Sequence, residues 1–240
     1  MSSKDILYLV MPAYNEEETI SDVVKEWYSV LEFGNNDSRL VVADAGSVDN
    51  THKILLELQK KYDKLVILSD SRKEHGPKLI YLYNYAIKNK ADYIFQTDSD
   101  GQTNPKEFEM FWNNRKKDDV ILGNRRVRGD GKVRAWVEKV VCFLLKIYFH
   151  VRVPDANAPF RLMKSKIVKK YIDKLPEDYN LPNIMLTTYF VYYKEKVKFI
   201  EISFKSRQGG INSINIKKIV KIGLKALSDF RRFKVGIKND

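Results

Sequence analysis

The sequence predicts an α/β protein in which a mostly parallel sheet is flanked by helices. Three observations lead to this class: short apolar runs alternate with segments of helical periodicity, several runs end in turns rich in Asp, Asn or Gly, and prolines stand at expected helix starts. The expected strands are Ile6–Met11, Leu40–Ala43, Leu65–Ser69, Tyr93–Thr97 and Val120–Gly123. The expected helices are Glu17–Leu31, Thr51–Tyr62, Pro77–Asn89 and Pro105–Arg115. This alternation would align the carboxyl ends of the strands at one edge of the sheet.

The alternation of strand and helix breaks after Gly123. A basic, glycine-containing loop follows, and an irregular segment rich in Pro, Asp and Asn lies further on. The elements expected in this half are a helix at Val133–His150, a helix at Leu181–Tyr193, a strand at Val197–Phe204 and a last helix at Ile214–Phe233. The last helix has an apolar face and many lysines around it. The expected organisation is therefore a catalytic domain over 1–213 and a C-terminal basic amphipathic helix over 214–240.

The composition indicates a folded, basic protein. The 240 residues include 43 Lys and Arg against 31 Asp and Glu, a formal net charge of +12. Such a charge predicts an anionic partner, either a phosphorylated substrate, a nucleic acid or an anionic lipid surface. The single cysteine, Cys142, excludes an intramolecular disulfide. Without an apparent signal peptide or an 18-residue apolar run, we expect a cytoplasmic protein, with peripheral attachment to the membrane left open.

The strongest chemical signal is the string Asp98-Ser99-Asp100-Gly101-Gln102, directly after an expected strand. In open α/β sheets, ligands bind beyond the carboxyl ends of the strands. Asp98 and Asp100 can point toward one centre, and carboxylate oxygens suit Mg²⁺ or Mn²⁺ bridging a diphosphate. The alternative for such a string is an Asx-type turn without a metal.

Two further motifs follow the first and second expected strands. Pro12-Ala13-Tyr14-Asn15-Glu16-Glu17 opens a helix, whose N-terminus would offer free backbone N–H groups to phosphate or ribose oxygens. The alternative is a simple helix cap with Asn15 as N-cap. Ala43-Asp44-Ala45-Gly46-Ser47-Val48-Asp49-Asn50-Thr51 brings another carboxylate to the same edge. Three such strand ends together favour a nucleotide pocket over three unrelated turns.

These motifs resemble the inverting GT-A glycosyltransferases of family 2, and most closely the polyprenyl-phosphate (dolichol-phosphate-mannose synthase-like) subgroup. Further matching segments are Gly123-Asn124-Arg125-Arg126, Asp155-Ala156-Asn157-Ala158-Pro159-Phe160-Arg161-Leu162 and the stretch 204–213. Together the segments span nearly the whole chain. The resemblance implies a GT-A fold, which is Rossmann-like, and transfer of a sugar from a nucleoside-diphosphate sugar with the help of Mg²⁺ or Mn²⁺.

The resemblance also implies roles for individual residues. The residues expected at the nucleotide sugar are Pro12, Tyr14, Glu16, Ala43, Asp44, Asp98, Ser99, Arg125, Arg134 and Arg207. The expected metal ligands are Asp98, Asp100 and Gln102, and the expected catalytic residues are Asp155 and Asp100. The arginines would bind donor or acceptor phosphates, because a guanidinium grips phosphate oxygens in pairs.

One position departs from the family pattern. Family members carry two adjacent acids in the turn after the second strand, whereas this chain has Asp44 and Ala45. Three explanations fit the sequence: Asp44 rotates toward the base, backbone groups near Ala43 hold the base, or the donor is unusual.

The nature of the acceptor decides what Asp155 would do. A hydroxyl acceptor needs a general base, and the resemblance places Asp155 on the acceptor side. A phosphate acceptor, with a second pKa of about 6, is already largely deprotonated, so Asp155 would orient it. We expect a polyprenyl phosphate at an anionic membrane surface, with a glycan or other hydroxyl acceptor as the alternative. An inactive relative or a nucleic-acid-binding protein is the alternative of another class, although the sequence has no recognised nucleic-acid motif.

Overall fold

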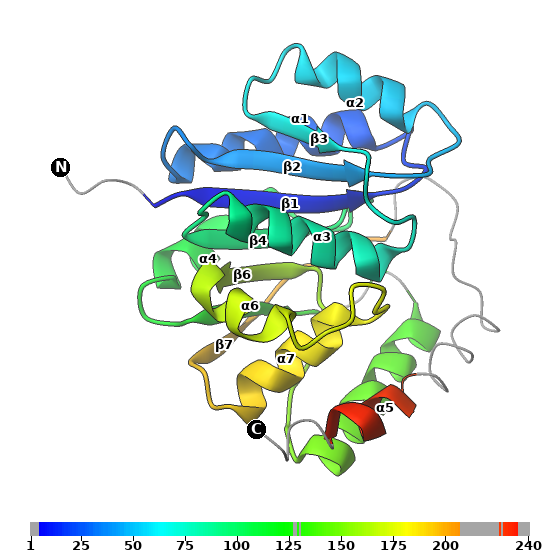
Figure 1. Ribbon diagram of the computed structural model, residues 1–240, viewed down its shortest axis with the longest axis vertical. Helices are drawn as coiled ribbons and strands as arrows, with labels where there is room; N and C mark the ends of the chain where they lie inside the picture. The colour runs from blue at the N-terminus through cyan, green and yellow to red at the C-terminus, as the bar shows by residue number, and fades with distance from the viewer. Residues whose placement is uncertain (1–4, 127–128, 130, 207–225, 227, 235–240) are drawn as a thin grey trace.

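The computed structural model describes residues 5–126, 129, 131–206, 226 and 228–234 of the chain. Seven strands form one sheet with the order β3-β2-β1-β4-β6-β5-β7 (Figure 1). The strands are β1 (Leu7–Ala13), β2 (Arg39–Asp44), β3 (Leu65–Leu68), β4 (Tyr93–Thr97), β5 (Val120–Asn124), β6 (Phe160–Lys164) and β7 (Val197–Glu201). The mostly parallel sheet expected from the sequence is confirmed.

The strand pairing brings three of the motif-bearing strands side by side. β1 pairs in parallel with β2, so that Ala13 lies opposite Asp44, and with β4, where Val10 lies opposite Gln96. β6 is antiparallel to both β4 and β5, whereas β7 is parallel to β5. The carboxyl ends of β1, β2 and β4 therefore lie next to one another at one edge.

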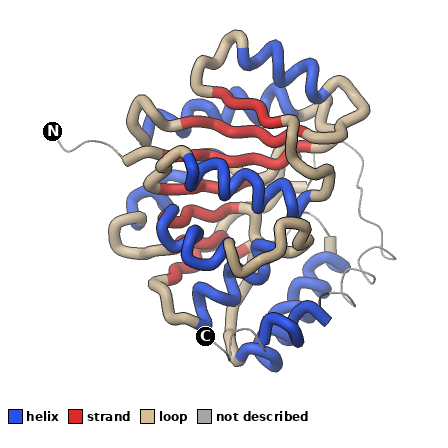
Figure 2. The backbone as a smooth tube through the Cα atoms, in the orientation of Figure 1, coloured by secondary structure: helices blue, strands red, loops and turns tan. Residues whose placement is uncertain are grey.

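Helices cover both faces of the sheet (Figure 2). The helices are α1 (Ile20–Tyr28), α2 (Thr51–Gln59), α3 (His75–Lys88), α4 (Phe108–Asn114), α5 (Lys132–Phe149), α6 (Ser165–Ile172) and α7 (Pro182–Tyr192), with short 3-10 helices at Ser29–Phe33 and Pro105–Glu107. Apolar side chains of α3, α5, α6 and α7 join one core cluster, and those of α1, α2 and α4 join the other. β1 serves both cores, because alternate side chains of a strand point to opposite faces.

The segment expected to be irregular contains a strand and a helix that the sequence pattern did not predict. β6 and α6 together cover Phe160–Ile172. Arg161 interrupts the apolar run of β6, yet its side chain is only 1% exposed. A buried arginine in a central strand therefore concealed the strand, since charged side chains are rarely buried completely.

Several element boundaries also differ from expectation. α1 begins at Ile20 rather than Glu17, and β7 ends at Glu201 rather than Phe204. The expected last helix lies largely outside the described residues, but residues 226 and 228–234 are helical. In this stretch Phe230 and Phe233 are buried against Phe149 and Tyr179, with ring centroids 5.7 and 5.1 Å apart. No helix among the described residues is both long and apolar enough to cross a membrane.

The aromatic side chains around Phe160 allow a test of whether β6 is part of the core. Phe160 is fully buried, and its ring lies 4.7 Å from Phe95 and 4.6 Å from Phe111 between centroids. Phe160→Ala should lower the free energy of unfolding by about 3–5 kcal/mol, measured by urea denaturation, because it leaves a cavity. Met110→Ala, at a side chain that is 45% exposed, should change it by less than about 0.5 kcal/mol. Equal effects of the two substitutions would show that β6 is not part of the core.

Candidate active site

Hydrogen bonds join the loops after β1 and β4 at the carboxyl edge of the sheet. The Ser99 hydroxyl donates to the Pro12 carbonyl at 2.9 Å, and the Thr19 hydroxyl lies 3.4 Å from the Ser99 carbonyl. Thr19 also donates to Glu16 Oε2 at 3.2 Å, and Glu16 is buried. The structure therefore brings Pro12, Glu16 and Ser99 together, and their roles at the nucleotide sugar stay predictions.

The loop after β1 is held by the turn after β2. The backbone N–H groups of Asn15 and Glu16 donate to the hydroxyls of Ser47 and Thr51, at 3.0 and 2.8 Å. Asn15 has a left-handed φ of 53°, and its side chain accepts from the Val48 N–H. The prediction of free N–H groups at a helix N-terminus here is therefore wrong, because side-chain oxygens of the second motif already accept from them. Asn15 is not the N-cap either, since α1 begins later, at Ile20.

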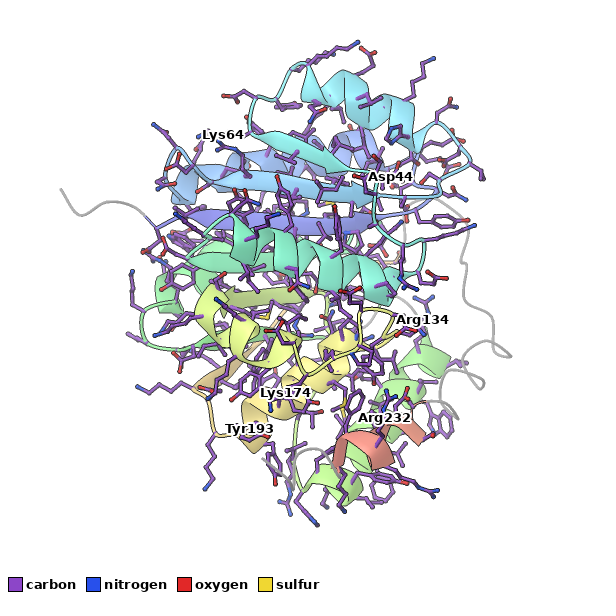
Figure 3. All side chains as sticks on the ribbon, viewed as in Figure 1. Asp44, Lys64, Arg134, Lys174, Tyr193 and Arg232 are labelled. Atoms are coloured by element: carbon purple, nitrogen blue, oxygen red, sulfur yellow. The ribbon has the colours of Figure 1, made fainter. Side chains whose placement is uncertain are left out.

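Asp44 lies at the end of β2 with its carboxylate almost completely buried (Figure 3). The Ser47 hydroxyl donates to Oδ1, and His52 Nδ1 lies 3.0 Å from Oδ2. The neighbouring Ala45 is buried, and Ala43 is in the core of β2. Family members carry two adjacent acids at this position, whereas this chain carries Asp44 alone. Ser47 and His52 fix the orientation of the Asp44 carboxylate.

A buried lysine that the sequence analysis missed lies beside this turn. Lys78 comes from α3, is 1% exposed, and donates from Nζ to the Ala13 carbonyl at 2.5 Å. The ammonium groups of Lys73 and Lys78 lie 5.0 and 5.4 Å from the centre of the Tyr14 ring. Burial lowers the pKa of Lys78 to about 8, although the charge of Asp44 opposes the shift. Nothing in the helical pattern of α3 distinguished this lysine from those on the surface.

The paired acids after β4 are both partly exposed at the same edge. Asp98 Oδ1 accepts from Gln96 Nε2 at 3.1 Å and lies 3.3 Å from His75 Nε2. The His75 side chain is 57% exposed, so the loss of hydration that opposes its protonation is limited, and the hydrogen bond and charge of Asp98 raise its pKa. Asp100 Oδ1 accepts the Gln102 N–H at 3.2 Å across Gly101, whose φ of +71° suits a glycine.

These two carboxylates fit a metal that is shared with a substrate. Among the described residues, no three His, Cys, Asp or Glu side chains gather closely enough to enclose a metal ion by themselves. Mg²⁺ is commonly held by one or two carboxylates together with substrate phosphates, and Asp98 and Asp100 fit that arrangement. Gln102 is buried, and its side-chain N–H donates to the Lys205 carbonyl at 2.7 Å. That contact ties the turn to the segment after β7, and the role of Gln102 as a ligand stays a prediction.

Arg125 and Asp155 form a buried ion pair beyond the end of β5. Arg125 Nε and Nη2 donate to the two oxygens of Asp155 at 2.7 and 2.9 Å, and Glu138 lies 3.6 Å from the same guanidinium. Both carboxylate oxygens of Asp155 are therefore engaged, and the residue is 3% exposed. This geometry favours the orienting role over proton abstraction. The pair borders a pocket of about 320 Å³ between α5 and Pro154.

Two arginines predicted for the site remain, Arg134 and Arg207. Arg134 lies in the first turn of α5 and is partly exposed (Figure 3). Arg207 lies outside the described residues. Their predicted roles at phosphate groups stay predictions.

The pKa of Lys78 makes the stability of the protein depend on pH. The folded protein would release this proton near pH 8, whereas an unfolded lysine releases it near 10.5. Between these values the unfolded chain binds more protons, so stability should rise with pH, by about 3 kcal/mol in total. Chemical denaturation from pH 7 to 10.5 should show that rise in the wild type and its loss in Lys78→Met. Lys25→Met, a surface control, should retain it, and parallel curves for the wild type and Lys78→Met would contradict the assignment.

A twisted, mostly parallel sheet whose strand ends gather carboxylates is typical of enzymes that bind nucleotides. The family model described as Glycosyl transferase family 2 matches residues 8–172, and the chain belongs to this family. The protein is therefore a glycosyltransferase.

Three relatives illustrate the match. A protein of Methanocaldococcus jannaschii is 27% identical over 194 residues, which cover 73% of this chain and 72% of that one. A UDP-N-acetylglucosamine–dolichyl-phosphate N-acetylglucosaminyltransferase of Methanococcus voltae is 30% identical over 113 residues, which cover 42% of this chain and 43% of that one. A dolichyl-phosphate beta-glucosyltransferase of Trichomonas vaginalis is 21% identical over 240 residues, which cover 91% of this chain and 71% of that one.

Solved structures share the fold. Glucosyl-3-phosphoglycerate synthase from Mycobacterium tuberculosis, in complex with Mn²⁺, UDP-glucose and glycerol 3-phosphate, superposes with a TM-score of 0.69 at 16% identity and covers 97% of this chain and 80% of that one. The same enzyme with Mg²⁺ and UDP gives a TM-score of 0.70 at 17% identity, covering 93% and 79%. The GT-A fold expected from the sequence is thereby confirmed.

Proposed function

We propose that this protein transfers a sugar from a nucleoside-diphosphate sugar to a polyprenyl phosphate, with inversion at the anomeric carbon. The observation that carries the proposal is the placement of Asp98 and Asp100 at the end of β4, in a loop hydrogen-bonded to the Pro12 carbonyl. The names of two relatives, both dolichyl-phosphate glycosyltransferases, support the choice of acceptor.

The donor half of the site would bind and orient the nucleotide sugar. Asp98 and Asp100 would hold Mg²⁺ or Mn²⁺, which supplies positive charge that stabilises the departing nucleoside diphosphate. Tyr14 and Asp44 stand at the ends of β1 and β2, where the base and ribose would lie, and the Lys73 and Lys78 ammonium groups lie near the Tyr14 ring. Ala45 removes one carboxylate from this region, so Asp44, fixed by Ser47 and His52, is the acid we expect to meet the base.

The acceptor half of the site suits a phosphate better than a hydroxyl. A phosphate acceptor is already largely dianionic at neutral pH and needs little proton abstraction. Asp155 is bound at both oxygens by Arg125, an arrangement that holds a guanidinium in place and leaves the carboxylate poorly disposed to take a proton. We therefore assign Asp155 the task of orienting Arg125 near the acceptor.

The outer face of α5 supports contact with a lipid surface, where a polyprenyl phosphate would reside. Large apolar side chains on this face are exposed: Val133 by 54%, Trp136 by 66%, Phe143 by 60% and Ile147 by 50%. Their spacings of three, seven and four residues place them on one stripe of the helix, and the exposed Lys139 and Lys146 lie beside it. Exposed aromatic and basic side chains on one helix face are typical of helices that lie on anionic membranes.

The donor site can be tested at Asp100. Asp100→Asn should lower metal-dependent turnover of the sugar nucleotide by at least about a hundredfold, because it removes a charged ligand, while the thermal unfolding midpoint stays close to that of the wild type. Turnover would be measured as the release of the nucleoside diphosphate, which accompanies both hydrolysis and transfer of the sugar. Asp22→Asn, at a carboxylate on α1 that is 79% exposed, is the matched control and should leave turnover unchanged. Full activity of Asp100→Asn would contradict the proposed donor site.

The lipid-surface contact can be tested at α5. Replacing both Trp136 and Phe143 with Ser should weaken binding to phosphatidylglycerol-containing vesicles by at least about tenfold in a sedimentation assay, since each buried aromatic side chain contributes more than about 1 kcal/mol. Met110→Ser removes an exposed apolar side chain from α4 instead and should have little effect. A wild-type protein that remains in the supernatant with these vesicles would contradict the membrane part of the proposal.

A further inference from the structure

A chain of three hydrogen bonds, of which the first two are buried and the last is partly buried, ends on the Asp98 carboxylate. The Tyr83 hydroxyl of α3 donates to Asn183 Oδ1 of α7 at 2.8 Å, and Asn183 Nδ2 donates to Gln96 Oε1 at 3.1 Å. Gln96 Nε2 then donates to Asp98 Oδ1 at 3.1 Å. Tyr83 and Gln96 are 0% exposed and Asn183 is 2% exposed. Two helices that carry none of the family motifs are thereby connected to the acid after β4.

The direction of these hydrogen bonds is fixed from both ends. Burial raises the pKa of Tyr83, so its hydroxyl keeps its proton and can donate. Suppose that the oxygen and nitrogen of both side-chain amides, those of Asn183 and Gln96, exchanged places. The Tyr83 proton would then lose its acceptor, and the Gln96 oxygen would face the Asp98 carboxylate. A buried polar group without a partner is costly, and two acceptors in contact repel one another. The chain therefore presents an N–H to Asp98.

The position of Gln96 in the sheet explains why this contact is rigid. Gln96 lies in β4, opposite Val10 of β1 and Arg161 of β6, so its backbone is held on both sides. Asn183 lies in the first turn of α7, and one turn later Thr187 accepts from the buried Arg161 at 2.6 Å. The Thr187 hydroxyl shares its proton between the Asn183 carbonyl at 2.8 Å and the Ala156 carbonyl at 3.0 Å. The same polar face of α7 is thus fixed to the residue after Asp155. Asn183 is consequently held in place by the tertiary structure and not by Gln96 alone.

We propose that Asn183 is a positioning residue of the donor site: acting through Gln96, it holds the Asp98 carboxylate in the orientation that binds the metal and the donor diphosphate. This inference rests on the proposed function, because it assumes that Asp98 binds a divalent metal. Groups that orient a metal ligand through a hydrogen bond contribute about 10–100-fold to metal affinity or activity.

Asn183→Asp is the most direct test, because it changes one nitrogen to an oxygen. An aspartate can still accept from Tyr83 but cannot donate to Gln96, so the Gln96 amide should turn over and present its oxygen to Asp98. We expect the Mn²⁺ concentration for half-saturation, followed by electron paramagnetic resonance with UDP or GDP present, to rise about 10–100-fold. Turnover at saturating Mn²⁺ should fall less than turnover at low Mn²⁺, a difference that general loosening of the fold would not produce.

A second variant keeps the test valid if Asn183→Asp does not fold. Tyr83→Phe removes only the hydroxyl that fixes the Asn183 amide and should raise the half-saturating Mn²⁺ concentration by about fivefold, the equivalent of one neutral hydrogen bond. In a protein that already carries Asn183→Asp, Tyr83→Phe should not raise the half-saturating Mn²⁺ concentration further, because both substitutions act through the same series of hydrogen bonds. Tyr179→Phe is the matched control: its hydroxyl is buried, and among the described residues it has no hydrogen-bond partner.

Three results would overturn the inference. If Asn183→Asp and Tyr83→Phe bind Mn²⁺ as tightly as the wild type, the chain does not position Asp98, although the donor site stands. If Tyr179→Phe weakens Mn²⁺ binding as much as Tyr83→Phe does, the effect comes from a loosened core. If the wild type itself binds no Mn²⁺ with either nucleotide, the proposed donor site fails and the role of Asn183 fails with it.

Discussion

The parallel pairing of β1 with both β2 and β4 is the constraint on which the rest of the site depends. It places Ala13 opposite Asp44 and brings the end of β4 beside Pro12, so that three loops distant in sequence meet at one edge. Hydrogen bonds then join the three loops. The backbone at the end of β1 and in the loop after it accepts from the Ser99 hydroxyl and donates to the hydroxyls of Ser47 and Thr51. These hydrogen bonds hold the three loops together, and Asp98 and Asp100 remain partly exposed beside them.

The charges of the site are held in two different ways. On the proposed donor side, Asp98 and Asp100 remain partly exposed, and Lys78 is buried against a carbonyl with a lowered pKa. On the proposed acceptor side, Arg125 and Asp155 form an ion pair in the interior. A buried pair of this kind contributes little net stability, because desolvation offsets the attraction, but it fixes geometry. Such a division suits a donor site that must accept a metal–diphosphate and an acceptor site that must keep its guanidinium in position.

Much of this arrangement could be predicted from the sequence. The expected strands before Gly123 all exist, and the acids at the ends of β2 and β4 lie at the predicted edge. β6 was missed because the buried Arg161 is its second residue and interrupts the apolar run. The position of Lys78 was missed because the helical pattern does not tell a buried lysine from an exposed one. The free N–H groups predicted near Glu16 are occupied, since local sequence cannot show that Thr51 reaches back to them. Contacts between distant segments, such as the chain from Tyr83 to Asp98, depend on tertiary packing and have no local signature.

The central claim is that this edge of the sheet binds a nucleoside-diphosphate sugar together with a divalent metal. Titration calorimetry of the wild-type protein with UDP-, GDP- and CDP-sugars, each with and without Mn²⁺, tests it most directly. The account predicts that the sugars of one nucleotide bind, and that their binding is lost when Mn²⁺ is removed. Absence of binding by every sugar nucleotide, accompanied by salt-sensitive binding of DNA, would contradict the account and favour a nucleic-acid-binding protein.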